Sequence, residues 1–450
     1  MPQRFRSLDV FRGATVALMI LVNNPGSWKA LYPPLAHADW HGITPTDLVF
    51  PFFLFAVGNA LALVMPGLLA GGQTVFWPRV LKRTAWIFGL GLLLNASPFV
   101  RWDASGELVL RSWESLRFMG VLQRIALSFG AAAIVVWCFG RRNPAGPLWV
   151  AAALLLGYWG VTLAWGAPGD PFSLQGWFGT AVDKALLGEA HLYRGEGVPF
   201  DPEGLASTAP AVAQVLLGWW VGQHISRGMG GIGTASGTST RNSTRNSTRN
   251  STRAKASASA TANDRNSNNA NANDSRPDLT TLSQAARPAL NSGAVSWLFL
   301  LASALLVIAY LWQLSFPLNK KIWSSSYVLC TTGLAMMALA CCIHLIEHRR
   351  RPAELWGWVR FFEVFGRNPL FIFVLSGLVP RALALLRWQD GVTAEGLPRW
   401  TSPLPWIYNQ VFAHIGNDPR LGSLLFACAN LAAYAALAAW LDRRKLYFGV

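Results

Sequence analysis

The chain has 450 residues, of which 52% are hydrophobic and only 13% are charged. Globular domains contain about a quarter charged residues, and a charge at the centre of a bilayer costs about 2.5–3.5 kcal/mol on insertion scales. The composition therefore excludes a soluble protein and predicts an all-α, polytopic bundle of transmembrane helices. The net charge of +16 does not indicate a nucleic-acid partner, because the basic residues gather in short segments between apolar stretches, as in cytoplasmic loops.

Ten segments contain the roughly 20 mostly apolar residues that a helix needs to cross a bilayer. In chain order they cover residues 8–26, 46–69, 83–100, 118–139, 147–166, 209–226, 294–315, 323–346, 361–384 and 421–441. Lys and Arg gather before the first segment and in the connections that follow every second segment, from Arg6 through Arg79 and Lys82 to Arg443. Because short basic loops stay in the cytoplasm, we expect these loops and both termini on the cytoplasmic face.

Two further stretches differ from the spans. Residues 227–291 are rich in Ser, Thr, Asn, Gly and Ala, and such a composition cannot bury enough apolar surface to offset chain entropy. We expect a disordered cytoplasmic loop there, between residues 1–226 with six helices and residues 292–450 with four. Residues 403–415 are too short and too polar to cross, so they are interpreted as a re-entrant or interfacial segment.

Most polar side chains lie in the loop between the first two predicted spans, residues 23–47, which the topology places outside. Thr44, Pro45 and Asp47 form the pattern of a helix start, in which the Thr caps, the Pro takes the first position and the carboxylate closes a capping box. The second helix therefore begins directly after this loop, and the positive end of its dipole points toward it.

His37 is the candidate catalytic base of this loop, because the pKa of an imidazole lies near neutrality. The alternative is an interfacial histidine with a satisfied hydrogen bond. A metal site at His37, Asp39 and His41 is a third interpretation, weakened by the lack of a further ligand cluster. The five cysteines lie in apolar segments without metal-ligand spacing, and no metal is expected.

Several charged side chains fall inside the apolar segments, where a charge indicates function unless it is paired within the bundle. Asp9 and Arg12 are three residues apart and are able to pair with each other on one helical face, so both interpretations stay open for Asp9. For Arg124 a functional role is favoured. The other charged or polar residues of this kind are Glu363, Arg367 and Asn368.

The outer loop of residues 167–208 contains carboxylates close to aromatic side chains, which suits a sugar or an amine. The alternative is a structured turn, which Asp-Pro and Glu-Gly pairs favour on their own. The polar and aromatic residues concerned are Asp170, His191, Tyr193, Asp201 and Glu203.

Six runs of the chain form a recognisable set: Arg6–Gly13, His37–Trp40, Asp47–Pro51, Gly120–Arg124, Asp201–Gly204 and Asn319–Ser324 with Ser326 and Tyr327. Together they resemble the heparan-α-glucosaminide N-acetyltransferase family and its bacterial relatives. The resemblance covers nearly the whole membrane region in the same order, except the low-complexity loop.

The resemblance implies an enzyme that takes acetyl from acetyl-CoA on the cytosolic side and transfers it to the amine of a glucosamine on the far side. It implies that His37 is the active-site histidine and that Asn23 is an asparagine beside it. It also implies a bacterial inner-membrane protein and favours a homodimer. The residues expected to bind the amino sugar are Asp39, Trp40, His41, Asp47, Arg124, Asp201, Glu203 and Trp323.

Acetyl-CoA carries several negative charges, so a basic cytoplasmic mouth is expected to hold its phosphates. Within this scheme His37 takes the proton of the acceptor amine, and Asn23 or a helix-end amide stabilises the oxyanion. The alternatives are an amino-sugar transporter, which also needs polar residues inside a bundle, and a non-catalytic scaffold. The candidate donor-binding residues are Arg6, Arg12, Arg79, Lys82, Arg83 and Arg360.

Overall fold

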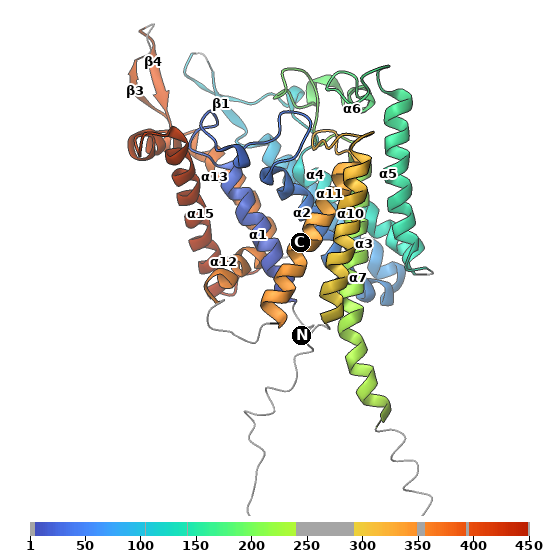
Figure 1. Ribbon diagram of the computed structural model, residues 1–450. Helices are drawn as coiled ribbons and strands as arrows, with labels where there is room; N and C mark the ends of the chain where they lie inside the picture. Colours follow the sequence, from blue (N-terminus) through green and yellow to red (C-terminus); the bar gives the residue numbers. More distant parts are fainter. Residues whose placement is uncertain are drawn as a thin grey trace, which may run out of the picture.

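The protein is described from a computed structural model covering residues 5–103, 105–141, 143–239, 292–348, 356–392 and 396–448. Long helices run side by side through the molecule (Figure 1). They are α1 (Arg6–Asn23), α2 (Val49–Ala70), α3 (Gly72–Ala96), α4 (Val121–Val135), α5 (Gly146–Trp165), α7 (Thr208–Ser239), α10 (Ser292–Trp312), α11 (Ser325–Ile343), α12 (Trp356–Arg367) with α13 (Pro369–Leu383), and α15 (Pro419–Arg443). Each of the ten predicted segments is helical, which confirms the all-α membrane fold.

Among the described residues, six helices are long and apolar enough to cross a membrane, and a seventh span is obtained if the bent pair α12–α13 counts as one. Helix α1 carries three charged residues, Arg6, Asp9 and Arg12, and α3 carries Arg79, Lys82 and Arg83. These charges lie in the first half of each helix, so both helices are strongly apolar only toward their other end.

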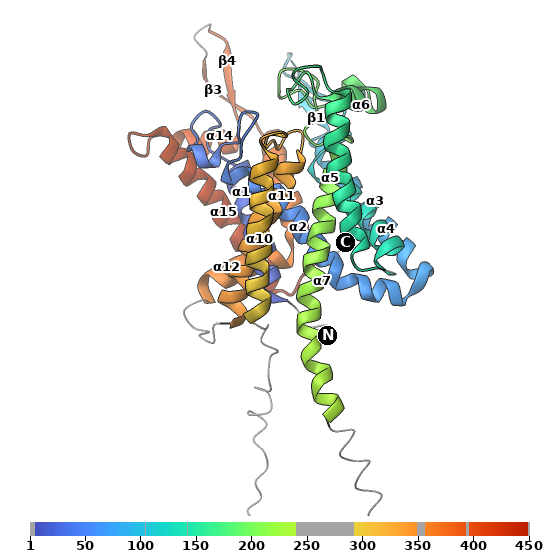
Figure 2. The same cartoon turned by 45° about the vertical axis from the view of Figure 1, so that its right-hand side comes forward.

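One end of the bundle, which we call the inner end, holds the starts of α1 and α3 and the ends of α2, α4 and α15. The opposite, outer end holds the connecting loops and two antiparallel hairpins (Figures 1 and 2). The hairpins, which the sequence did not predict, pair β1 (Val100–Trp102) with β2 (Leu108–Leu110) and β3 (Trp388–Val392) with β4 (Pro398–Thr401). The short helices are α6 (Phe178–Leu187), α14 (Pro403–Ile407), η1 (Pro33–Leu35), η2 (Pro45–Leu48), η3 (Trp113–Ser115) and η5 (Glu189–His191), and π-helical turns follow at η4 (Val136–Gly140), η6 (His344–His348) and η7 (Tyr408–Phe412).

Close backbone contacts hold the centre of the bundle together. A Cβ added to Gly58 of α2 would lie 2.1 Å from the carbonyl oxygen of Val215 in α7, and one added to Gly218 would lie 2.3 Å from that of Phe55. Small residues at such crossings let helices approach closely, which is a main source of helix association in membranes. The glycines therefore fix the position of α7 against α2, below the outer loops.

Two predicted boundaries differ from the structure. The span predicted at residues 361–384 is two helices that meet at an angle of 80°, with the break at Asn368. Pro369 lacks the N–H that a continuous helix needs, which explains the break. Helix α7 continues to Ser239, past the predicted end at residue 226. The remainder of the predicted disordered loop, residues 240–291, lies outside the described residues.

Candidate functional site

The turn before α2 places a buried carboxylate against His37. Thr44, Pro45 and Asp47 form the capping box that the sequence predicted. Asp47 Oδ2 accepts hydrogen bonds from the backbone N–H of Ala38 and of Thr44, each at 3.1 Å, and from Thr44 Oγ1 at 3.0 Å. Its other oxygen, Oδ1, lies 2.7 Å from His37 Nδ1. The capping residue is thus also the partner that orients the imidazole.

His37 and Asp47 differ sharply in exposure. The His37 side chain is 44% exposed and the Asp47 side chain 1%. When His37 Nδ1 donates its proton to Asp47, Nε2 carries a lone pair and is able to act as a base at the outer surface. The pair has the geometry of an exposed imidazole held by a buried orienting carboxylate.

Lys320, which sequence reasoning did not select, completes this group. Its Nζ lies 3.0 Å from His37 Nδ1 and 3.3 Å from Asp47 Oδ1. Burial lowers the pKa of the Lys320 ammonium, while the charges of Asp47 and Glu203 oppose that shift. Lys320 lies in the loop between α10 and α11, inside the run Asn319–Ser324 that carries the family resemblance, and that run was the one sequence signal by which it could have been selected.

The loop of residues 39–42 packs against the same segment. Lys321 Nζ donates to the backbone oxygen of Asp39 at 2.7 Å and lies 5.6 Å from the ring centre of Trp40. The indole N–H of Trp40 donates to Phe172 O at 2.8 Å. His41 Nδ1 lies 3.4 Å from Asn319 Nδ2, so the two histidines have different partners. Among the described residues, no three His, Cys, Asp or Glu side chains are grouped to hold a metal ion.

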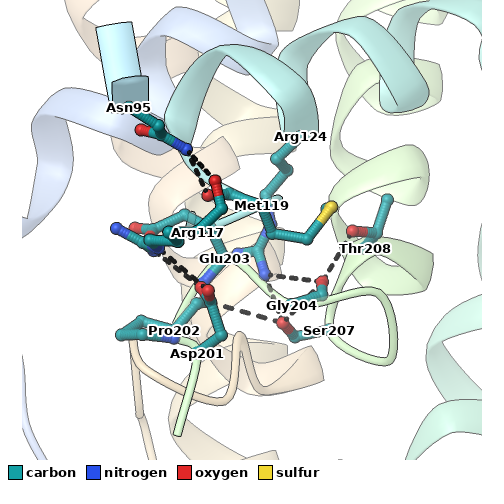
Figure 3. A network of polar contacts seen from close by, with 10 residues as sticks. All are labelled: Asn95, Arg117, Met119, Arg124, Asp201, Pro202, Glu203, Gly204, Ser207 and Thr208. Carbon is teal, nitrogen blue, oxygen red and sulfur yellow. Dashed lines mark hydrogen bonds and ion pairs between the residues drawn. The ribbon is translucent and has the colours of Figure 1, made fainter. Parts of the chain in front are cut away.

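A second polar network lies beside the first and is shown in Figure 3. Arg117 donates from Nε to Asp201 Oδ2 at 2.9 Å, and from Nη2 to Asp201 Oδ1 at 2.6 Å and to Glu203 Oε2 at 2.5 Å. Asn95 Nδ2 donates to the backbone oxygens of Arg117 and Met119, which holds this segment at the start of α4. Burial would raise the pKa of Glu203, but the charges of Arg117 and Arg124 lower it overall. Asp201 and Glu203 are thus bound by Arg117, which the sequence analysis did not select.

Arg124 is completely buried and lies between the two networks. Its guanidinium carbon is 5.0 Å from the ring centre of Trp323, and its Nη2 donates to Gly204 O at 3.2 Å and to the Ser207 hydroxyl. Trp323 is buried at a φ of 54°, a left-handed conformation that a non-glycine residue adopts only under tertiary constraint. Arg124 and Trp323, both predicted to bind substrate, therefore contact each other.

Asn23 is not brought into contact with His37: among the described residues, no hydrogen bond joins the two side chains. Asn23 lies at the end of α1 and lines a cavity of about 470 Å³ at the outer end, together with Gln123 and Arg117. The family resemblance implied that Asn23 lies beside the histidine; residues 24–36 connect the two along the chain.

The six predicted donor-binding residues separate into two groups at the inner end. Arg6 pairs with Glu363 at 3.1 Å, Arg12 with Asp9, and Arg360 with Asp442. The other group lines a cavity of about 750 Å³ together with apolar and aromatic side chains. Its members are Arg79, Lys82 and Arg83, with Trp86, Phe129 and Phe448 among the aromatic walls.

None of these three residues pairs with a carboxylate of the described residues. The guanidinium of Arg83 lies 4.8 Å from the ring centre of Phe129, and its Nε is buried without a hydrogen-bond partner. This inner cavity therefore combines unpaired positive charge with flat apolar walls, which suits an anion that carries an aromatic ring.

Residues 4–188 match the family model described as heparan-alpha-glucosaminide N-acetyltransferase, catalytic. Over these residues the chain is similar to that family. The heparan-alpha-glucosaminide N-acetyltransferase of Homo sapiens is 30% identical over 264 residues, which is 50% of this chain and 39% of the human protein. That of Mus musculus is 27% identical over 263 residues, 49% of this chain and 39% of the mouse protein. The chain thus aligns with about two fifths of the length of each of these two proteins. The segment that matches the family model includes His37, Asp47 and Arg117.

Proposed function

We propose that this protein is an N-acetyltransferase of the bacterial inner membrane. It takes acetyl from acetyl-CoA at the inner, cytoplasmic end and transfers it to the amine of glucosamine or a related amino sugar at the outer end. The observation that carries the proposal is the His37–Asp47 pair, which lies inside the segment that matches the family's catalytic model.

The outer group supplies what acyl transfer to an amine needs. The amine nitrogen attacks the thioester carbonyl, the C–N bond forms, the C–S bond breaks, and CoA leaves as a thiolate. His37 Nε2 takes the proton that the amine loses, and Asp47 stabilises the imidazolium that results. Lys320, 3.4 Å from His37 Nε2, is placed to stabilise the negative charge that develops on the carbonyl oxygen.

The inner cavity supplies the donor site. Arg79, Lys82 and Arg83 offer charge to the phosphates of acetyl-CoA, and the aromatic walls offer a surface to its adenine ring. We assign donor binding to this group rather than to Arg6, Arg12 and Arg360, because those three are already paired with carboxylates.

The direct test is an assay of purified protein with acetyl-CoA and glucosamine, in which free CoA and N-acetylglucosamine are both measured. His37→Ala is expected to lower the rate by about 10²-fold or more, because general base catalysis contributes that much. The matched control is His414→Ala, since His414 is exposed in another outer loop. A His37→Ala protein that is as fast as the wild type would show that the role is misassigned.

The rival function is an amino-sugar transporter, and cavities at both ends of one bundle favour it as well. Uptake of labelled glucosamine into proteoliposomes without acetyl-CoA would support the transporter and contradict the enzyme. The enzyme predicts no uptake, and appearance of labelled N-acetylglucosamine only when acetyl-CoA is present.

A further inference from the structure

The amine of Lys320 lies where the proposed reaction delivers the acetyl group. Its Nζ is 3.0 Å from Nδ1 and 3.4 Å from Nε2 of His37, and 3.3 Å from Asp47 Oδ1. The acceptor amine has to reach the same Nε2 in order to lose its proton. The site therefore contains a second primary amine, which belongs to the chain itself.

The contacts of Lys320 admit its neutral form. Two nitrogens 3.0 Å apart share a hydrogen bond only if one of them carries a lone pair. When His37 Nδ1 carries the proton, as the base form of Nε2 requires, that lone pair belongs to Lys320 Nζ. The Lys320 side chain is only 23% exposed, which disfavours its charged form. A neutral lysine amine in such a desolvated position is a nucleophile.

The charges that face Lys320 come from several elements. Burial and, to a lesser degree, the charge of Lys321 lower the pKa of Lys320, while the charges of Asp47 in η2 and Glu203 in the outer loop raise it. Burial prevails, so the pKa lies below that of an ordinary lysine. A larger fraction of this amine is therefore neutral at neutral pH than of an exposed lysine.

Other lysines of the outer end lack this environment. Lys321 Nζ donates to Glu196 Oε2 at 2.6 Å and to Asp39 O at 2.7 Å, and an ammonium held in such an ion pair has no lone pair for attack. Lys29 is exposed, and no side chain of the described residues is hydrogen-bonded to its Nζ. Both lysines thus provide internal references for the reactivity of Lys320.

We propose that Lys320 is a self-acetylation site, which acetyl-CoA modifies when no amino sugar occupies the site; this inference rests on the proposed function. Lys320 Nζ attacks the thioester carbonyl, the C–N bond forms, the C–S bond breaks, and CoA leaves as a thiolate. The proton that Nζ loses passes to His37 Nε2, and the imidazolium then gives it to the thiolate.

Acetylation of Lys320 ends catalysis at the same site. The amide nitrogen carries no positive charge, so the contact with Asp47 is no longer an ion pair and the oxyanion loses its partner. The added acetyl group also takes up space beside His37 that the acceptor needs. Because an amide is a much poorer acyl donor than a thioester, the acetyl group stays on Lys320. The amino sugar therefore protects the enzyme from its own donor.

The test incubates the purified full chain with acetyl-CoA at neutral pH without sugar, and locates acetyl groups by peptide mass spectrometry. Lys320 is expected to be acetylated at least about 10²-fold faster than Lys29, because general base catalysis contributes that much. His37→Ala is expected to lower the rate at Lys320 by about the same factor, whereas the control His414→Ala should leave it unchanged. Glucosamine present during the incubation is expected to suppress the modification.

A second measurement follows acetyl transfer to glucosamine after incubation with acetyl-CoA alone. The wild type is expected to lose activity in step with acetylation of Lys320. Lys320→Arg, compared with its own starting rate, is expected to lose none, because a guanidinium stays charged and is no nucleophile. Incubation with CoA in place of acetyl-CoA is the control and should cause no loss.

The outcomes separate this inference from the proposed function. Transfer to glucosamine without preferential acetylation of Lys320 would overturn the inference and leave the proposed function intact. Acetylation of Lys320 that is as fast in His37→Ala as in the wild type would overturn the inference as well. Acetylation of Lys320 that depends on His37, without any transfer to glucosamine, would support the inference and contradict the proposed acceptor.

Discussion

His37 is accessible at the outer surface, while the carboxylate that orients it is fixed by three donors from the same turn. Asp47 therefore acts both on the fold, by capping the turn, and on the imidazole. Lys320 adds a positive charge to the pair. The acetyl-transfer proposal depends on this geometry more than on any single side chain.

Asp47→Asn should separate these two roles. The amide keeps the size of the carboxylate and still accepts from the turn, but it cannot stabilise an imidazolium as an anion does. We expect the rate of acetyl transfer to fall by about 10²–10⁴-fold, since loss of an orienting carboxylate in comparable triads costs up to about 10⁴. The melting temperature measures the contribution of Asp47 to the capped turn. A rate of acetyl transfer near that of the wild type would mean that Asp47 caps the turn and has no role in catalysis.

Asp183 in α6 gives a prediction of pH dependence. Burial and the nearby charge of Asp201 raise the pKa of Asp183 to about 6, and its Oδ2 has no hydrogen-bond partner. Because the folded pKa lies above the ordinary value near 3.8, the folded state binds the proton more tightly. Its stabilising effect is complete below pH 3.8 and is lost as the pH rises through about 6.

Replacement of this carboxyl by Asp183→Asn should remove that dependence. The wild type is expected to melt at a lower temperature at pH 7 than at pH 5, and the variant should show a smaller difference between the two. Melting curves of both proteins in one detergent at the two pH values provide the measurement. An equal difference in melting temperature between the two pH values for both proteins would show that Asp183 is ionised in the folded protein.

At the residue scale, the sequence predicted what local patterns determine. The capping box at Thr44 and Asp47 and the Asp9–Arg12 pair are confirmed, because each depends on residues three apart. Lys320 was missed because a lysine in a polar loop is ordinary, and only the fold brings it to His37. Whether Asn23 and His37 form a hydrogen bond likewise depends on how the intervening loop is folded, and none joins them among the described residues.

Individual elements were predicted well where hydropathy determines them and poorly where backbone pairing does. The apolar segments became helices, since no other open structure satisfies backbone groups in a bilayer. The strands of the two hairpins have only three to five residues each, too few for a recognisable periodic signal. The break between α12 and α13 did have a sequence signal, the pair Asn368-Pro369. The continuous hydropathy of the segment concealed this signal.

The crossing of α2 and α7 tests the packing of these elements. Gly58→Ala would place a Cβ 2.1 Å from Val215 O, in backbone that cannot yield easily. Overpacking of this kind costs about 1–3 kcal/mol or more, so we expect a lower melting temperature and less folded protein. The matched control is Gly160→Ala in α5, where a Cβ meets nothing within 4 Å. Equal melting temperatures for the two variants would show that the contact is not tight.

The whole molecule has a cavity at each end, and the inner one contains positive charge that the described residues do not neutralise. Arg83→Gln is expected to raise the KM for acetyl-CoA about tenfold or more, with a smaller effect on kcat, because a charge-assisted hydrogen bond contributes about 1.5–3 kcal/mol to binding. Arg141→Gln, at the inner end but outside the cavity, is the control. A KM unchanged in Arg83→Gln would place the donor elsewhere.

In the proposed mechanism the donor binds at the inner end while His37 acts at the outer end. Proteoliposomes with the protein in one known orientation, acetyl-CoA confined to one side and glucosamine to the other, test this most directly. We expect N-acetylglucosamine on the glucosamine side only when acetyl-CoA faces the inner end, and none with His37→Ala. Product formed equally well when both substrates are present only at the outer end would contradict it.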